Sequence, residues 1–237
     1  MTDSVHLAQT RLVNWTLVCD DTGLILIDAG YPAMRAEVLA SVRGLGYDVG
    51  DIRAILLTHA HIDHFGTAIW FAAEHGIPVH CHPDEVGHAK REYLEQASPI
   101  DVVRQAWQPR WLSWSLEIAR KGAFVRDGIP TATALTSDIA AELPGRPVPI
   151  ATPGHTGGHC SYLVDGVLVS GDALVTGHPT SVKRGPQLLH SVFNHDEINC
   201  ARSLTTIAML ETDVLVPGHG DIWRGPIREM AEEAGRR

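Results

Sequence analysis

Short apolar runs alternate with amphipathic stretches along the first third of the chain. Two strand-length apolar segments flank the sequence DDTG within residues 11–30, which predicts two strands joined by a turn. The pattern then predicts a helix over 31–48, a buried strand over 52–59, a helix over 66–76 and a strand over 77–83. This alternation of strands and helices indicates an α/β fold in which helices cover a sheet.

The alternation stops over residues 84–145. Two stretches, over 84–97 and 101–123, have helical patterns, and a loose segment rich in Thr, Pro and Gly follows them. Strands resume on the far side of this region. We therefore predict one domain over residues 1–237 with a helical insertion at about 84–145.

The last third of the chain returns to short strands. Three apolar runs between 148 and 174 are separated by turn sequences. A helix over 194–210 follows, with Asn194 or Asp196 as its N-cap, and a last strand over 212–220 precedes a short polar tail.

Composition narrows the function classes. The 237-residue chain has a formal net charge of -9, which disfavours a nucleic-acid surface. No apolar run reaches membrane-spanning length, and the N-terminus lacks the pattern of a signal peptide. The four cysteines are widely spaced and contain no CxxC pair. We expect a cytoplasmic protein with reduced thiols that binds neither nucleic acid nor membrane.

Histidines and aspartates gather at the ends of the predicted strands. The sequence LLTHAHIDHFG follows one apolar run, and single residues of the same types follow three later runs, in ATPGHTGG, LVSGDAL and VLVPGHG. The residues concerned are His59, His61, Asp63, His64, His155, Asp172 and His219. Loops that leave one edge of a sheet lie together, so we expect these side chains to form one site.

The spacing within the first cluster indicates two ions. His59 and His61 are two residues apart and can both face one ion from an extended loop, but not from one helical face. Asp63 and His64 lie where the next helix begins and point toward a second ion. Five imidazoles and two carboxylates suit two divalent ions of borderline hardness. A chance cluster among fourteen histidines is the alternative interpretation.

The motifs THAHIDH, PGHTGG, SGDAL and PGHG resemble those of the metallo-β-lactamase superfamily in their order and approximate spacing. The resemblance runs from about Asn14 to Gly220, and residues 84–145 are its least typical part. It implies a four-layer αββα sandwich with the site at one edge of the two sheets.

The resemblance also implies a role for each residue. It assigns His59, His61 and His155 to the first metal. It assigns Asp63, His64 and His219 to the second, and makes Asp172 the bridge between them. Asp28, in LIDAG, matches an acidic position that orients the ligand-bearing loop. Thr58 and Thr156 either assist in this or only cap turns. The implied cofactors are two divalent ions, zinc in the first place, with iron or manganese as alternatives.

This chain differs from several branches of the superfamily, and each difference disfavours the reaction of that branch. The β-lactamase branches lack a bridging aspartate, and flavodiiron proteins carry Glu in place of His61 and need a flavin domain. Glyoxalase II matches all seven ligands but continues into a helical domain that 18 residues after His219 cannot form. RNase Z-type nucleases share the ligands but act on RNA, which the acidic charge disfavours. A glyoxalase II-like or lactonase-like hydrolase remains.

Acyl-homoserine lactonases are similar in size and in having a helical insertion. They place a substrate-facing tyrosine after the bridging aspartate, where this chain has none. We expect His178, His190 or His195 either to supply a hydrogen bond to the substrate instead, or to be a surface or packing histidine.

Aromatic residues mark the predicted insertion. Trp107, Trp111 and Trp114 are spaced four and three apart, which predicts one face of a helix. That face is a packed core, a contact in a homodimer, or an apolar wall that selects a substrate with an apolar acyl part. Cys160 lies in HCSYLV, which alternates like a strand, so we expect a packed thiol and not a nucleophile.

We predict a dinuclear metal-dependent hydrolase that cleaves an ester, thioester or lactone of a small molecule. Two cations lower the pKa of a shared water, and the bridging hydroxide attacks the carbonyl carbon. Asp63 is the catalytic residue that orients the hydroxide or relays its proton. The alternatives are a mononuclear iron oxidoreductase similar to persulfide dioxygenases and a β-lactam-hydrolysing enzyme. A purely structural site is disfavoured, because structural zinc normally has a closed set of four ligands.

Overall fold

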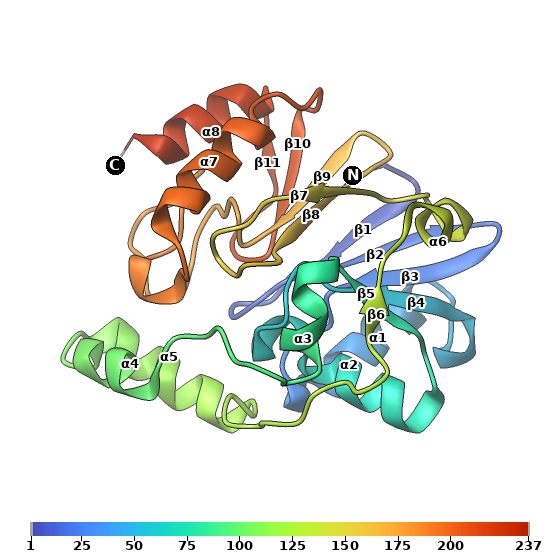
Figure 1. Ribbon diagram of the computed structural model, residues 1–237, viewed down its shortest axis with the longest axis horizontal. Helices are drawn as coiled ribbons and strands as arrows, with labels where there is room; N and C mark the ends of the chain where they lie inside the picture. Colours follow the sequence, from blue (N-terminus) through green and yellow to red (C-terminus); the bar gives the residue numbers. More distant parts are fainter. Residues whose placement is uncertain (1, 237) are drawn as a thin grey trace.

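Two β-sheets lie face to face between two layers of helices (Figure 1). The computed structural model describes residues 2–236. The six-stranded sheet, in the order β1-β2-β3-β4-β5-β6, consists of Val5–Ala8 (β1), Trp15–Asp20 (β2), Gly23–Ile27 (β3), Ile52–Leu56 (β4), Val79–Cys81 (β5) and Thr133–Ala134 (β6). The five-stranded sheet, in the order β11-β10-β9-β8-β7, consists of Val148–Ala151 (β7), Cys160–Val164 (β8), Val167–Gly171 (β9), Val214–Pro217 (β10) and Trp223–Arg224 (β11).

Helices cover the outer face of each sheet. The helices are Arg35–Gly44 (α1), Ile62–His75 (α2), Val86–Ala89 (α3), Pro99–Gln105 (α4), Pro109–Arg120 (α5), Ser137–Glu142 (α6), Glu197–Ile207 (α7) and Ile227–Gly235 (α8). The 3-10 turns are Pro32–Met34 (η1), Val49–Asp51 (η2), Pro83–Glu85 (η3) and Ser191–Phe193 (η4). In Figure 1, α1 and α2 lie beside the six-stranded sheet and α7 and α8 beside the other, while α4 and α5 lie at one end of the molecule, away from the strands.

Alternating apolar side chains build this layering. In β3, Leu24 and Leu26 pack in the cluster under α1 and α2, whereas Ile25 and Ile27 pack in the cluster between the sheets. In β9, Val167 and Val169 face the space between the sheets, and Leu168 packs in the cluster under α7 and α8. Because successive strand residues point to opposite faces, both faces of each sheet are buried. The fold is the predicted αββα sandwich.

Most predicted elements are confirmed. The strands on either side of DDTG are β2 and β3, the strand before the histidine cluster is β4, and Asp196 is the N-cap of α7. Three predictions of detail are wrong. Strand β1 was missed, α8 lies where a polar tail was expected, and the helix expected over 84–97 is only η3 and α3.

The tryptophan pattern also differs from its prediction. Trp107 lies in the connection between α4 and α5, because Pro109 begins a separate helix. Its side chain is 80% exposed, whereas Trp111 and Trp114 are buried on α5. The three rings therefore do not share one helical face. None of the described helices is long and apolar enough to span a membrane.

The close packing of α2 on η1 depends on Gly66. A Cβ atom at this position would overlap Cδ and the backbone nitrogen of Pro32. We expect Gly66→Ala to lower the free energy of unfolding by about 1–3 kcal/mol, because the helix must move away from η1. Gly44→Ala is the matched control, since a Cβ there meets no atom within 4 Å and the change should stay within about 0.5 kcal/mol. Urea unfolding of both variants measures this, and equal midpoints would contradict the packing argument.

Candidate metal centre

The seven predicted residues meet at one edge of the two sheets. His59 and His61 lie in the loop after β4, and Asp63 and His64 lie in the first turn of α2. The remaining three follow β7, β9 and β10 and are His155, Asp172 and His219. Parallel strands β3 and β4 and parallel strands β9 and β10 end at this edge, which brings their loops together.

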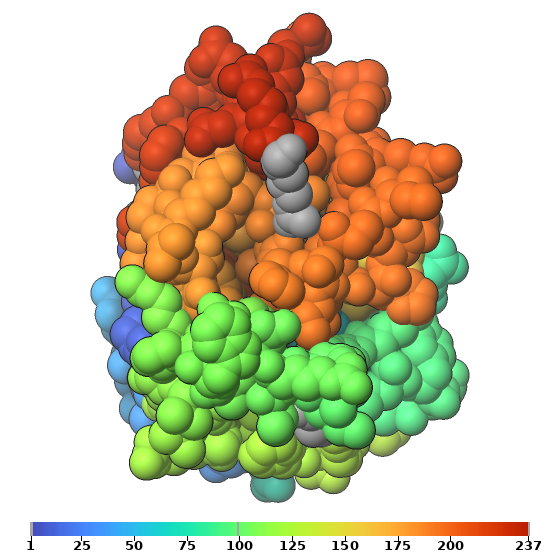
Figure 2. All heavy atoms as spheres, turned by 90° about the vertical axis from the view of Figure 1, so that its left-hand side faces the viewer, coloured from blue at the N-terminus to red at the C-terminus, as the bar shows by residue number. Residues whose placement is uncertain are grey.

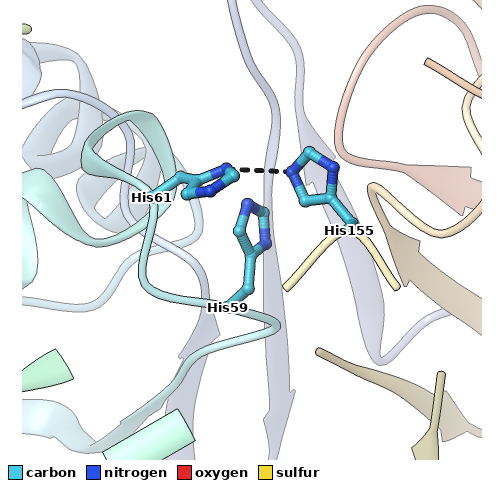
Figure 3. A group of neighbouring side chains, drawn as sticks. All are labelled: His59, His61 and His155. Atoms are coloured by element: carbon cyan, nitrogen blue, oxygen red, sulfur yellow. Dashed lines mark hydrogen bonds between the residues drawn. The ribbon is translucent and has the colours of Figure 1, made fainter. Parts of the chain in front are cut away.

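The ligand-type atoms form overlapping groups of three. Within each group they lie within 4.8 Å of one another, and the groups are His59, His61 and His155; His59, His64 and Asp172; and Asp63, His64 and His219. Figure 3 shows the first group, in which the three rings point toward one another from two separate loops. Oδ2 of Asp172 lies 3.4 Å from Nε2 of His155 and 3.3 Å from Nε2 of His219. Asp172 thus lies between the first and third groups.

A hydrogen bond on the outer nitrogen of each ring fixes its tautomer. His61 donates from Nε2 to the carbonyl oxygen of Glu95 over 2.6 Å, and His219 donates from Nδ1 to that of Leu12 over 2.7 Å. His155 donates from Nδ1 to Oδ1 of Asn194 over 3.0 Å. Each of these rings therefore directs the lone pair of its other nitrogen into the site.

Asp28 fixes the other two rings. Its carboxylate accepts hydrogen bonds from the backbone N–H of Thr58, from the Thr58 hydroxyl and from Nδ1 of His64, at 2.8, 2.7 and 2.8 Å. Because the Thr58 hydroxyl donates to Asp28, its oxygen accepts from Nδ1 of His59 at 3.0 Å. Asp28 has a positive φ of 63°, a backbone conformation unusual for aspartate. One carboxylate thus orients a ring of the first group and a ring of the third.

A second buried carboxylate, Glu85, ties the two loops of the first group together. It accepts hydrogen bonds from the backbone N–H of Ala60 at 2.7 Å and from the Thr156 hydroxyl at 2.8 Å. It also lies 2.8 Å from Nδ1 of His88. Ala60 lies between two of the histidines and Thr156 follows the third. Sequence reasoning singled out Thr156 but missed its partner, since Glu85 stands in an ordinary charged stretch, DEVGH.

The electrostatic surroundings of the groups differ. Burial and the neighbouring imidazoles lower the pKa of His59 and of His61 well below its usual value. Burial also acts to lower the pKa of His64, but the carboxylates of Asp172 and Asp28 outweigh it and raise this pKa. The first group is therefore a set of neutral rings, and the third is a region whose carboxylates attract positive charge.

The donor set fits a cation. Nδ1 of His61 and Nε2 of His155 carry lone pairs and lie 2.9 Å apart, an arrangement that repels unless a cation lies between them (Figure 3). Nε2 of His59 and Oδ1 of Asp172 are buried without a hydrogen-bond partner among the described residues. Leaving such atoms unpaired costs about 1–3 kcal/mol each. Gly218 leaves the space open, since a Cβ there would overlap Oδ1 of Asp172.

His159 is a further buried imidazole at the site, but it is not a candidate ligand. Its Nε2 accepts a hydrogen bond from the backbone N–H of Asp172 at 3.1 Å, and its Nδ1 lies 2.9 Å from the Thr152 hydroxyl. Both nitrogens are thus engaged, and burial lowers the pKa of this ring to about 3. His159 positions the backbone that carries Asp172. Its neighbour Cys160 is a buried thiol whose pKa is raised by burial to about 12, as expected for a packed cysteine.

A pocket of about 270 Å³ opens beside the candidate ligands. Its walls come from α4, α5 and η4 and include Val102, Val103, Leu112, Ile118 and Phe193. Figure 2 views this end of the molecule, where the green surface of α4 and α5 meets the orange surface around η4 and α7. A larger groove, about 500 Å³, lies between α7 and α8 and contains none of the seven residues.

Only some of the residues predicted for the substrate pocket line the pocket in the structure. Trp114 and His178 line the pocket. Trp111 stacks behind it on Phe193, with ring centroids 5.3 Å apart, and His190 contacts Trp111 from the outside at 5.4 Å. Trp107 and His195 are not among the lining residues. The ring of His195 lies 3.9 Å from the carboxylate of Glu95.

Comparison with known proteins identifies the family of the chain and agrees with its fold. Residues 8–219 match the family model of the metallo-beta-lactamase superfamily. A probable metallo-hydrolase of Bacillus subtilis (strain 168) is 32% identical over 209 residues, which cover 83% of this chain and 75% of that protein. A hydroxyacylglutathione hydrolase of Shewanella sp. (strain ANA-3) is 28% identical over 162 residues, covering 65% of this chain and 49% of that protein.

Solved structures show the same fold. A metallo-beta-lactamase family protein from Thermus thermophilus superposes with a TM-score of 0.65 at 23% identity, covering 98% of this chain and 78% of that one.

The role of Asp28 can be tested by Asp28→Asn. An amide has one acceptor oxygen in place of two, so it cannot accept all three hydrogen bonds that the carboxylate accepts, and Thr58 and His64 lose their fixed orientation. We expect zinc affinity to fall about 10- to 100-fold, as is typical when a group that orients a ligand is removed. Zinc retained after dialysis against a competing chelator measures this, with Asp51→Asn, at the exposed cap of η2, as control. Equal retention in both variants would show that Asp28 does not orient the ligands.

Proposed function

The chain belongs to the metallo-beta-lactamase superfamily and is a metal-dependent hydrolase, and from that premise we propose that two metal ions act together in it to cleave an ester, thioester or lactone of a small molecule with an apolar acyl part. The observation that carries the proposal is the contact of Asp172 with histidines of both outer groups, at 3.4 and 3.3 Å. A carboxylate in that position can bridge two ions. We assign His59, His61 and His155 to one ion and Asp63, His64 and His219 to the other.

The proposed ions are zinc, which is consistent with a donor set of imidazoles and carboxylates. When bound, they would supply Lewis-acid chemistry, lowering the pKa of water and polarising a carbonyl group. The chain supplies the rest. Asp63 lines the pocket, and it and His61 are the two of the seven residues that are only partly buried, so Asp63 can take a proton from water beside the ions. Asp28 and Glu85 keep the ligand loops rigid while this happens.

The pocket supports an acyl substrate with an apolar part. Its walls near the opening include Val103, Leu112 and Phe124, whose side chains are also partly open to solvent. Aliphatic walls of this kind bind hydrocarbon, and each buried methylene contributes about 0.8 kcal/mol, or about fourfold in affinity. The relationship to a hydroxyacylglutathione hydrolase also supports cleavage of an acyl group. We propose further that residues 84–145 are an insertion into a single domain and that α4 and α5 form the outer wall of the pocket.

The decisive experiment combines metal content with activity. We expect purified protein to bind two zinc ions per chain and to hydrolyse 4-nitrophenyl decanoate with a higher kcat/KM than 4-nitrophenyl acetate. Removal of the metal with a chelator should abolish activity, and zinc should restore it. A single bound iron with sulfide-dependent oxygen uptake would contradict the proposal, as would hydrolysis of β-lactams alone.

A single ligand variant tests the assignment. We expect His61→Ala to lose one zinc per chain and more than about 100-fold in kcat/KM, because loss of a ligand exceeds the effect of losing a group that only orients one. His6→Ala is the matched control, since His6 lies on β1 near the N-terminus and its ring hydrogen-bonds only to the backbone carbonyl of Asp3 among the described residues. Full metal content and activity in His61→Ala would remove His61 from the site.

A further inference from the structure

Two polar side chains of the pocket have no part in the candidate metal centre. Tyr31 and His178 both line the pocket, and they are only 3% and 6% exposed. They come from distant parts of the chain: Tyr31 precedes η1, and His178 follows β9 by seven residues. A buried tyrosine hydroxyl or imidazole N–H normally has a hydrogen-bond partner.

The proton of His178 lies on Nε2, the ring nitrogen that Thr180 does not contact. Its Nδ1 accepts the backbone N–H of Thr180 at 3.3 Å and lies 2.7 Å from the Thr180 hydroxyl. A backbone N–H can only donate, so Nδ1 carries the lone pair and Nε2 carries the hydrogen. The ring lies against His219 with centroids 4.8 Å apart and against Trp114 at 5.6 Å, between the candidate metal centre and α5.

Tyr31 lines the same pocket. Its backbone carbonyl is held by the Thr67 hydroxyl at 2.7 Å, and α2 packs directly on it through Gly66. A tyrosine hydroxyl carries its proton at neutral pH, so it can donate a hydrogen bond. Among the described residues, nothing hydrogen-bonds to this hydroxyl or to Nε2 of His178, and neither atom is sealed from solvent.

We propose that the Tyr31 hydroxyl and Nε2 of His178 are two hydrogen-bond donors for the two oxygens of the substrate's acyl linkage. An oxygen ester or lactone has a carbonyl oxygen and a linking oxygen, whereas the sulfur of a thioester is a weak acceptor. The two donors therefore favour an oxygen ester or lactone over a thioester. This inference rests on the proposed function and narrows its substrate class.

Binding to metal-free protein tests the donors separately from catalysis. The probe is δ-decanolactone, titrated calorimetrically into wild-type protein, Tyr31→Phe, His178→Phe and the double variant. Removal of one hydrogen bond should raise Kd about 3- to 10-fold, and the double variant should lose about 10- to 100-fold in affinity. The sulfur analogue, δ-decanothiolactone, should bind the wild type more weakly and be affected by only one of the two single variants.

Controls separate a donor from a packing role. His178→Gln keeps an N–H near the position of Nε2 and should bind the lactone within about threefold of wild type. Tyr47→Phe and His80→Phe make the same chemical changes outside the pocket and should leave Kd unchanged. Thermal unfolding identifies any variant that fails to fold. If His178→Phe fails to fold, Tyr31→Phe and His178→Gln still test the proposal.

The outcomes distinguish this inference from the proposed function. Unchanged lactone affinity in both Tyr31→Phe and His178→Phe overturns the donor pair, even if the metal-loaded enzyme hydrolyses esters. No lactone binding by metal-free wild type also overturns it. Weakened binding in both variants supports the pair, even if the loaded enzyme hydrolyses none of the acyl probes. With activity present, KM for the lactone should rise in both variants at full metal content.

Discussion

The hydrogen bond on the outer nitrogen of each imidazole is the constraint from which the chemistry of this protein follows. Five rings are held in this way and direct their inner nitrogens into the site. Asp28 holds His64 directly and His59 through Thr58, while Asn194 and the carbonyl oxygens of Glu95 and Leu12 hold the other three. Unpartnered lone pairs at such close range repel one another, and two inward-facing atoms have no hydrogen-bond partner among the described residues. A site arranged in this way is stabilised by cations and strained without them.

The αββα sandwich makes that arrangement possible. Two sheets pack through Ile25, Ile27, Tyr162 and Val169, and the carboxyl ends of strands from both sheets reach the same edge. The hydroxyl of Tyr162 donates to the carbonyl of Leu57 at 2.8 Å, which ties one sheet to the loop that leaves the other. Glu85 adds a second link between the ligand loops. Ligand-type side chains that are far apart in sequence are therefore held by one rigid frame.

The sequence was sufficient to identify the ligand-type residues, because each follows an apolar run that ends in a loop. It was also sufficient for most strands of the two sheets, whose alternation is regular, although β1 was missed. The sequence could not predict the hydrogen bonds of Glu85 or of the Leu12 carbonyl, because their partners lie far away in the chain. Trp107 was misplaced because its spacing from Trp111 fits a helix, although Pro109 starts a new one. Tyr31 was overlooked because the sequence places it only at the start of a predicted helix, and the fold is needed to bring it into the pocket.

In the proposed dinuclear centre, the edge of the two sheets holds two metal ions with Asp172 between them. Anomalous scattering from crystals of the zinc-loaded protein, measured on both sides of the zinc absorption edge, would locate these ions. We expect two peaks, one among His59, His61 and His155 and one among Asp63, His64 and His219, with Asp172 in contact with both. A single peak, or peaks away from these residues, would contradict the proposal.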